Sequence, residues 1–377
     1  MAALVCVAIA GAVSSCSTSP TSTIADTAQS CGGSWQPPSS GPMTFDIANQ
    51  TGTVADIQLL ATGTQRVYAE IPTLGPGTTR PLEVTLGPGK YTWQCASLSG
   101  EIDTSNPGLV TGHKVRSTPW YIPARPDDLA AAVDTYRNSV SQGLTTLAAD
   151  TDTLQGLVDS GQIPAARSQW LVAHLDYERL GAAYDTFGAY DGEIDGRADG
   201  LPQGVNDPHF TGFLRLEYGL WHGQPHSQLT AVADQLDVFV HGLVNAFPHQ
   251  LMLDTDLALR AHEILENALQ FEMTGDTDEG SHTNLATVQA NVQGTETTIN
   301  ALEPLLTVRN PHLLASAESG VNALDQQLAA YDGPTGWTPL QSLTTTQRED
   351  LDGSISSLVE TLSLIPGSLR QFAVGAD

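Results

Sequence analysis

The sequence predicts a multi-domain α and β fold, in which a small β-sandwich is followed by an all-α helical bundle. Residues 43–122 contain short alternating segments separated by Gly- and Pro-rich turns, which is typical of a sandwich. From residue 127 onward, apolar residues recur at helical spacing instead. The first 124 residues carry five basic and seven acidic side chains, whereas the rest of the chain carries ten and 35. Such asymmetry indicates two domains with different roles.

The first 30 residues predict a lipoprotein signal peptide and a flexible tether. Ala2 to Val13 is an apolar run that is short for a membrane span but suits the core of a signal peptide. It ends in Val-Ser-Ser-Cys, which resembles a bacterial lipobox and makes Cys16 the candidate lipidation site. Residues 17–30 are rich in Ser and Thr. An ordinary cleaved signal peptide is the alternative, and either implies export.

Residues 31–124 predict the sandwich. The expected strands cover 43–47, 54–60, 66–71, 80–86 and 91–95. Two cysteines, Cys31 and Cys95, lie in this domain. In an exported chain, an isolated pair of cysteines most simply forms a disulfide.

Residues 125–377 predict an antiparallel helical bundle with modest loops. Helices are expected at about 129–150, 164–190, 209–222, 226–246, 253–273, 283–307, 311–331 and 345–373. The segment 187–208 is rich in Gly and Asp, so it is expected to be a long loop.

The net charge of −27 excludes one class of partner and favours another. Binding to nucleic acid needs clustered cationic side chains, which an acidic chain does not provide. Cationic partners, including metal ions, fit this charge better. The alternative interpretation is that the charge only keeps an exported protein soluble.

Three carboxylates lie where a helical core is expected. Glu178, Glu217 and Glu266 each fall in an apolar stripe, and His174 and His262 precede two of them by one helical turn. A carboxylate in an apolar interior is costly unless it is paired, protonated or bound to a metal. Facing carboxylates and imidazoles are how helical bundles hold iron and other divalent metals. The alternative is pairing with nearby arginines, for which Arg179, Arg197, Arg215 and Arg260 are available.

At these residues the chain resembles the EfeO-type family of bacterial iron-uptake lipoproteins, whose helical part is an imelysin domain. The resemblance rests on stretches that start at Ala173, Ile194, Phe210 and Gly280 and read AHLDYERLGAAY, IDGRAD, FTGFLRLEYGLW and GSHTNL. It implies a metal site with a His-x-x-Glu motif, in which the glutamate is Glu217. The motif histidine is replaced by Leu214, which removes imidazole ligation at this point.

The resemblance implies iron, ferrous or ferric, as the bound metal, with another divalent metal as an in vitro substitute. Hard ferric iron suits oxygen ligands, so iron binding tolerates the missing histidine. The expected ligands are Glu178, Asp195, Glu217 and Glu266, and the second-rank candidates are His174 and His262.

The N-terminal sandwich resembles the cupredoxin-like domain of the same family, through the Gly-Pro-Gly turns and the segment that ends at Cys95. This resemblance implies a tentative second metal site at Glu70 and Cys95. A disulfide between Cys31 and Cys95 would leave no thiolate for that site, so the two predictions for Cys95 compete.

The function that the resemblance implies is the capture of iron outside the membrane and its delivery to an Efe-type permease, without catalysis. The implied partners are that permease, a haem peroxidase of the same system, and the membrane through a lipid anchor on its outer face. A surface protein that binds polysaccharide or serves as an adaptor is the alternative. An imelysin-type metallopeptidase is a further one, although the chain contains neither a His-Glu-x-x-His nor a Gly-x-Ser-x-Gly motif.

Overall fold

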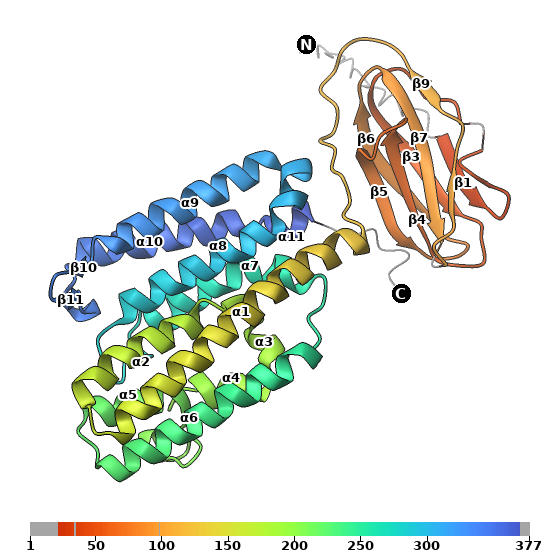
Figure 1. Cartoon of the computed structure of the whole chain (residues 1–377). Coiled ribbons are helices and arrows are strands. Elements are labelled where there is room, and N and C mark those ends of the chain that lie inside the picture. Colours follow the sequence, from red (N-terminus) through yellow and green to blue (C-terminus); the bar gives the residue numbers. More distant parts are fainter. Residues whose placement is uncertain (1–21, 34, 98, 370–377) are drawn as a thin grey trace, which may run out of the picture. The chain divides into compact units, whose positions relative to one another are not determined.

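The computed structural model describes residues 22–33, 35–97 and 99–369 (Figure 1). The predicted signal peptide and Cys16 lie outside these residues. The described chain divides into two compact units, 22–123 and 124–369, and the division falls in the Pro-containing segment between strands and helices. No described helix is long and apolar enough to cross a membrane.

The first unit is built from two β-sheets. One sheet has the strand order β2-β1-β3-β6, in which β1 runs parallel to β3 and the other pairs are antiparallel. The second has the order β5-β4-β7-β8, and β9 also pairs with β7. The strands are β1 (Ser22–Thr27), β2 (Ser30–Cys31), β3 (Gly41–Asn49), β4 (Ala55–Ala61), β5 (Val67–Leu74), β6 (Thr79–Leu86), β7 (Gly89–Ser97), β8 (Ile102–Thr104) and β9 (Gly108–Val110).

Part of the predicted tether belongs to the first sheet. Residues 22–27 form β1 beside β3, and Ile24 of β1 is fully buried in the core between the sheets. The tether prediction is therefore wrong for residues 22–30, because the Ser/Thr-rich composition concealed an alternating strand. A prediction from composition does not detect one isoleucine that is buried within an otherwise polar segment.

Aromatic side chains and a disulfide join the two sheets. Phe45 of β3 meets Trp93 of β7 edge to face, with ring centroids 5.2 Å apart. Cys31 of β2 is bonded to Cys95 of β7, so the disulfide links one sheet to the other. Burial of large aromatic rings and a cross-link between sheets together stabilise a domain this small.

The second unit consists of two rings of four helices each. In the first ring, α1 (Pro126–Asp159) contacts α2 (Ile163–Glu178) and α6 (His226–Ala246), and α5 (Gly212–Trp221) closes the ring. The second ring contains α7 (Asp256–Asn267), α8 (Asn284–Arg309), α9 (Pro311–Ala329) and α10 (Thr345–Leu362). Helix α8 also packs against α1 and α2, so the rings share one core (Figure 1).

Shorter elements complete the second unit. They are η1 (Gly181–Ala183), α3 (Tyr184–Phe187), α4 (Ala189–Asp195), η2 (Gly204–Asn206), η3 (Phe247–His249), η4 (Ala268–Glu272), β10 (Asp332–Gly333), β11 (Gly336–Trp337), η5 (Leu340–Ser342) and α11 (Ile365–Ser368).

The helices bury the side that their periodicity predicts. In α6 the buried residues, Leu229, Ala233, Leu236, Val240 and Leu243, are three or four positions apart and so share one face. Helix α10 begins with a capping box between Thr344 and Gln347.

Two of the differences from prediction matter for the site. Helix α2 ends at Glu178 and not near residue 190, and α4 lies within the segment expected to be a loop. Gly188 has a φ of +61°, which breaks the path between α3 and α4. This break turns α4 back toward the end of α2.

Candidate metal centre

The end of α2 supplies the first two groups of a buried polar cluster. His174 and Glu178 lie one turn apart on the buried face of α2, and both side chains are less than a tenth exposed. The imidazole Nε2 is 3.1 Å from Oε1 of Glu178. The ring of Trp170 stacks on the imidazole at 4.8 Å, which fixes its plane. The periodicity of α2 therefore turns an imidazole and a carboxylate toward the core.

Helix α8 holds the Glu178 carboxylate from the other side. A side chain at Gly294 would approach the carbonyl oxygen of Arg179 to 2.6 Å, so only glycine lets α8 come this close. Asn291, one turn earlier on α8, donates its Nδ2 to Oε2 of Glu178 at 2.7 Å. Tyr184 donates its hydroxyl to the same oxygen at 3.2 Å. Glu178 is thus held in one orientation by three neighbours.

The third member of the cluster, Asp195, is the last residue of α4. Its Oδ1 lies 3.2 Å from Nε2 of His174. The start of α5 crosses the end of α4 at Gly212, which has a φ of +79° and leaves no room for a side chain beside the carbonyl oxygen of Ile194. One ligand atom from each of His174, Glu178 and Asp195 lies within 4.8 Å of the others. The separations of 3.1 and 3.2 Å between the imidazole Nε2 and the two carboxylate oxygens suit atoms that share one metal ion with bonds of about 2.0–2.2 Å.

A cavity of about 240 Å³ opens beside the cluster. A water molecule occupies roughly 30 Å³ in the liquid, so the cavity has room for an ion together with part of its hydration shell. The polar side chains that line it are mostly acidic or carry amide and hydroxyl groups, namely Glu178, Tyr184, Asp191, Asp195, Arg197, Asn267, Glu272, Thr277 and Asn291. Oxygen donors of this kind are the ligands that hard cations prefer.

Glu272 is a buried carboxylate of this cavity that the sequence reasoning missed. It ends the π-helical turn η4, and Asn284 donates its Nδ2 to the carboxylate at 3.3 Å. A signal was present in the sequence. The buried residues of α7 and η4 include Ala261, Leu265 and Ala268, three or four positions apart, and Glu272 continues this spacing.

The cavity contains more buried carboxyl groups than the charged imidazole of His174 can balance. Burial disfavours the charged imidazole of His174, but the carboxylates of Asp195 and Glu178 outweigh it and raise the pKa well above its usual value. Burial also opposes the ionised form of Glu178, yet the bond from His174 lowers its pKa. For Asp195 and Glu272, burial wins and raises the pKa to about 7 and about 8. Near neutral pH the cavity therefore holds protons that a cation can replace.

Glu217 is buried as predicted but lies apart from the three-residue cluster. It is 0% exposed, and its Oε1 accepts a hydrogen bond from the backbone N–H of Ser281 at 2.7 Å. The other oxygen has no hydrogen-bond partner among the described residues. Burial raises the pKa of Glu217 to about 7. Leu214, one turn before it, packs with Phe210 and Ala198 in a small apolar cluster.

Glu266 and His262 are not brought to the cavity. The Glu266 side chain is 52% exposed, and its nearest described imidazole is His262 at 3.9 Å. The expectation that Glu266 faces the core is wrong, because the buried face of α7 is the one that continues to Glu272. Of the four expected ligands, the structure brings together Glu178 and Asp195, buries Glu217 nearby and leaves Glu266 at the surface.

The tentative second site in the sandwich does not assemble. Cys95 is part of the disulfide and faces the core between the sheets. Residue 57 pairs with both 95 and 71, so the adjacent Glu70 lies on the opposite face of the sheet. There Glu70 accepts hydrogen bonds from Gln58 and Tyr121. The prediction of a joint Glu70–Cys95 site is therefore wrong.

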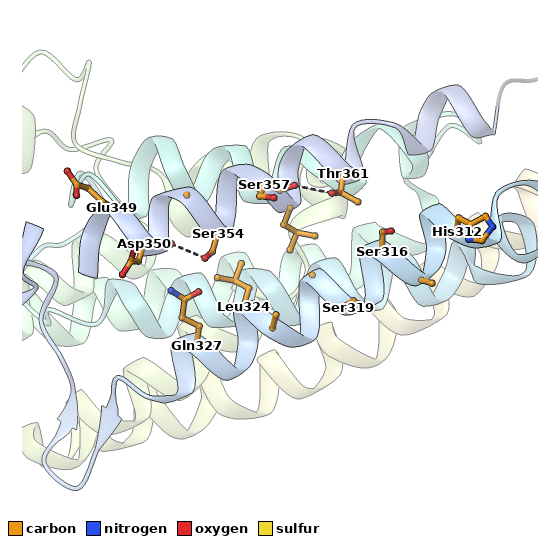
Figure 2. Close-up of a pocket in the computed structure, with 15 residues that line it drawn as sticks. His312, Ser316, Ser319, Leu324, Gln327, Glu349, Asp350, Ser354, Ser357 and Thr361 are labelled. Atoms are coloured by element: carbon orange, nitrogen blue, oxygen red, sulfur yellow. Dashed lines mark hydrogen bonds between the residues drawn. The ribbon is translucent and has the colours of Figure 1, made fainter. Parts of the chain in front are cut away.

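Two other features of the second unit do not rival this cavity. Asp152, Asp237 and His241 form a partly exposed ion-paired group on α1 and α6, with His241 2.9 Å from Asp152. A groove of about 860 Å³ separates α9 from α10, but its ionisable groups do not converge. Figure 2 shows His312 at one end of it and Glu349 and Asp350 at the other.

Comparison with known proteins agrees with the resemblance that the sequence suggested. The sequence profile of the imelysin family, which is grouped with the M75 peptidases, matches residues 132–365. The iron uptake system component EfeO of Escherichia coli O157:H7 is 29% identical over 306 residues, which is 80% of each chain. The proteins of the same name from Escherichia coli K12 and Shigella flexneri match with the same identity and coverage.

Proposed function

The chain belongs to the imelysin family, and from this premise we propose that it is an extracytoplasmic iron-binding protein of an iron-uptake system. The observation that carries the proposal is the cavity lined by Glu178, Asp195 and Glu272, with His174 in contact with the first two. Without a bound cation, three of the four carboxylates that line this cavity, Asp191, Asp195 and Glu272, have raised pKa values. A multivalent cation removes this cost, because it compensates the buried negative charge and displaces the protons.

We assign the roles of the residues from their positions. Glu178 and Asp195 are the primary oxygen ligands, and His174 supplies Nε2 between them once its proton has left. Glu272 lines the same cavity and adds a third carboxylate. Glu217 is assigned to a subsidiary position, from which its unpartnered oxygen can support an ion or a metal-bound water. The set is rich in oxygen, so it favours iron over softer metals.

The relatives support the physiological setting of the proposal. They are named as components of an iron uptake system, and the match covers four fifths of this chain. We propose that the chain hands its iron to an Efe-type permease and works with a haem peroxidase of that system. Lipidation at Cys16, which lies outside the described residues, would tether it to the outer face of the membrane. No catalytic step is part of this function.

The test is a titration of the purified protein with ferrous iron under anaerobic conditions and with a soluble ferric chelate. Elemental analysis of the protein as isolated comes first. Asp195→Asn keeps the shape of the side chain but removes its charge, and we expect iron to bind about 100-fold more weakly. Glu266→Gln is the matched control, because this carboxylate is exposed and away from the cavity.

Equal affinity in wild type and Asp195→Asn would contradict the assigned site. Absence of iron binding in the wild type would contradict the function itself. Casein hydrolysis that a chelator abolishes would instead support the peptidase alternative, and the same preparations can be used for that assay.

A further inference from the structure

One positively charged side chain, that of Arg197, lies among the described residues that line the carboxylate cavity. Gly192 and Asn267 are exposed, and Arg197 and Phe271 are partly buried, whereas Glu178 and Glu272 lie deeper. Arg197 is the cationic residue among those that line the cavity. The arginine therefore lines the rim, the part of the cavity that is more exposed to solvent than Glu178 and Glu272.

Arg197 is held by an aromatic ring and not by a carboxylate. Its Cζ lies 3.8 Å from the centroid of the Phe271 ring, a short cation–π contact. The arginine ion pairs found in the described chain belong to other residues, namely Arg125, Arg179, Arg260 and Arg309. The guanidinium thus stays at the rim although several acidic side chains line the same cavity. An arginine whose role was to neutralise these carboxylates would form direct ion pairs with them.

The backbone below Arg197 is fixed. Gly196 caps the end of α4, and a side chain there would come within 2.2 Å of the carbonyl oxygen of Gly192. The residue before it, Asp195, is bound to His174. Phe271 belongs to the π-helical turn that ends in Glu272. The stacked pair therefore joins the two elements that supply Asp195 and Glu272.

We propose that Arg197, stacked on Phe271, limits the affinity of the cavity for multivalent cations and so allows the bound ion to be released. This inference rests on the proposed function. The positive charge at the rim repels a cation in the cavity, and the repulsion grows in proportion to the charge of that cation. A transfer protein needs binding that is tight enough to load and weak enough to unload. Arg197 supplies the second condition without being a ligand.

The experiment compares wild type with Arg197→Gln in titrations with Mn²⁺ and with Tb³⁺ at pH 7. Removal of the charge should tighten Mn²⁺ binding by about tenfold and Tb³⁺ binding by about 30-fold, because Coulomb energy scales with ionic charge. Stopped-flow release into excess chelator should be slower in the variant. A residue that only supported the fold would give the opposite sign, with weaker binding of both ions.

Three further variants separate charge from packing. Arg197→Lys keeps the charge and should stay within about threefold of wild type. Arg197→Met is neutral like the glutamine variant but covers the Phe271 ring, so it repeats the test if Arg197→Gln does not fold. Arg125→Gln removes the same charge from an arginine that is 69% exposed at the start of α1, and its affinity should not change.

The outcomes are distinct. Wild-type protein that binds iron but neither of these ions overturns this inference alone, whereas wild-type protein that binds none of the three overturns the proposed function as well. Wild-type binding combined with unchanged or weaker binding in both neutral variants overturns the role of Arg197 alone. Tighter binding that is equal for Mn²⁺ and Tb³⁺ also overturns it, since the effect would then not be Coulombic.

Discussion

The two units of this protein treat similar residues in opposite ways. In the sandwich, Glu70 and Cys95 lie on opposite faces of one sheet, and the sulfur is already used in a disulfide. In the helical unit, Glu178, Asp195 and Glu272 come from three separate elements and line one cavity. Glu70 has hydrogen-bond donors beside it, whereas three of the four carboxylates that line the cavity, Asp191, Asp195 and Glu272, have raised pKa values.

The difference shows what distinguishes a candidate metal site from acidic residues in general. A single carboxylate with its own neutral hydrogen-bond donors, such as Glu70, gains little by binding a cation. Carboxylates that are buried together gain more, because the cation relieves a cost already present in the folded state. Substitutions in either unit test this difference.

The largest effect is expected in the sandwich. Loss of the disulfide in the Cys31→Ser, Cys95→Ser double variant should lower the free energy of unfolding of this unit by about 4 kcal/mol, since the bond closes a long loop. Differential scanning calorimetry of the whole chain should show a lower midpoint temperature for one unfolding transition. Iron affinity should stay the same, and a parallel loss of affinity would mean that the sandwich takes part in binding.

The second effect compares one glutamate from each unit. Glu178→Gln should weaken iron binding by about 100-fold, or roughly 2.7 kcal/mol, because it removes a charged ligand without changing the shape. Glu70→Gln should leave affinity unchanged. Isothermal titration calorimetry measures the iron affinity of both variants. An equal change in the two would contradict the prediction.

The third effect is a pH dependence with opposite signs for binding and stability. The pKa values of Asp195 and Glu272 rise from ordinary values of 3.8 and 4.5 to about 7 and about 8, so the folded state holds extra protons between these limits. Stability of the metal-free protein should therefore fall as pH rises from 5 to 8. The raised pKa of His174 acts in the same direction, because its stabilising charge is lost as pH rises.

Metal affinity should rise over the same range, by about tenfold per pH unit for each proton displaced. Titrations at pH 6, 7 and 8, together with denaturation of the metal-free protein, check both signs. Stability and affinity that both stay constant over this range would show that these carboxylates are already ionised in the empty cavity.

The smallest effect is expected at Glu217. Its pKa of about 7 and its unpartnered oxygen mean that ionisation at pH 8 is opposed by the fold. Glu217→Gln should therefore stabilise the metal-free protein by about 1–2 kcal/mol at pH 8 and by less at pH 6. Chemical denaturation at the two pH values measures this, with Glu266→Gln as an exposed control that should show no change.

A site residue was easier to predict when its position depends on its own helix than when it depends on contacts with distant segments. Glu178 and Glu217 were predicted to face inward from their own helical stripes, and both are buried. Glu266 was assigned to the wrong face, because the stripe through Ala261 and Ala268 was not followed to Glu272. Asp195 was found only through the resemblance, since the segment around it was expected to be a loop.

By itself the sequence determined the order of the two structural types, the cysteines available to the sandwich and the buried faces of most helices. These follow from periodicity and composition, which act within a few residues of each other. Only the tertiary structure decided that residues 178, 195 and 272 meet and that 266, 70 and 95 do not. That choice depends on close backbone crossings at Gly212 and Gly294 and on the side of the sheet to which each residue points. Such contacts between distant segments produce no periodic pattern in the sequence.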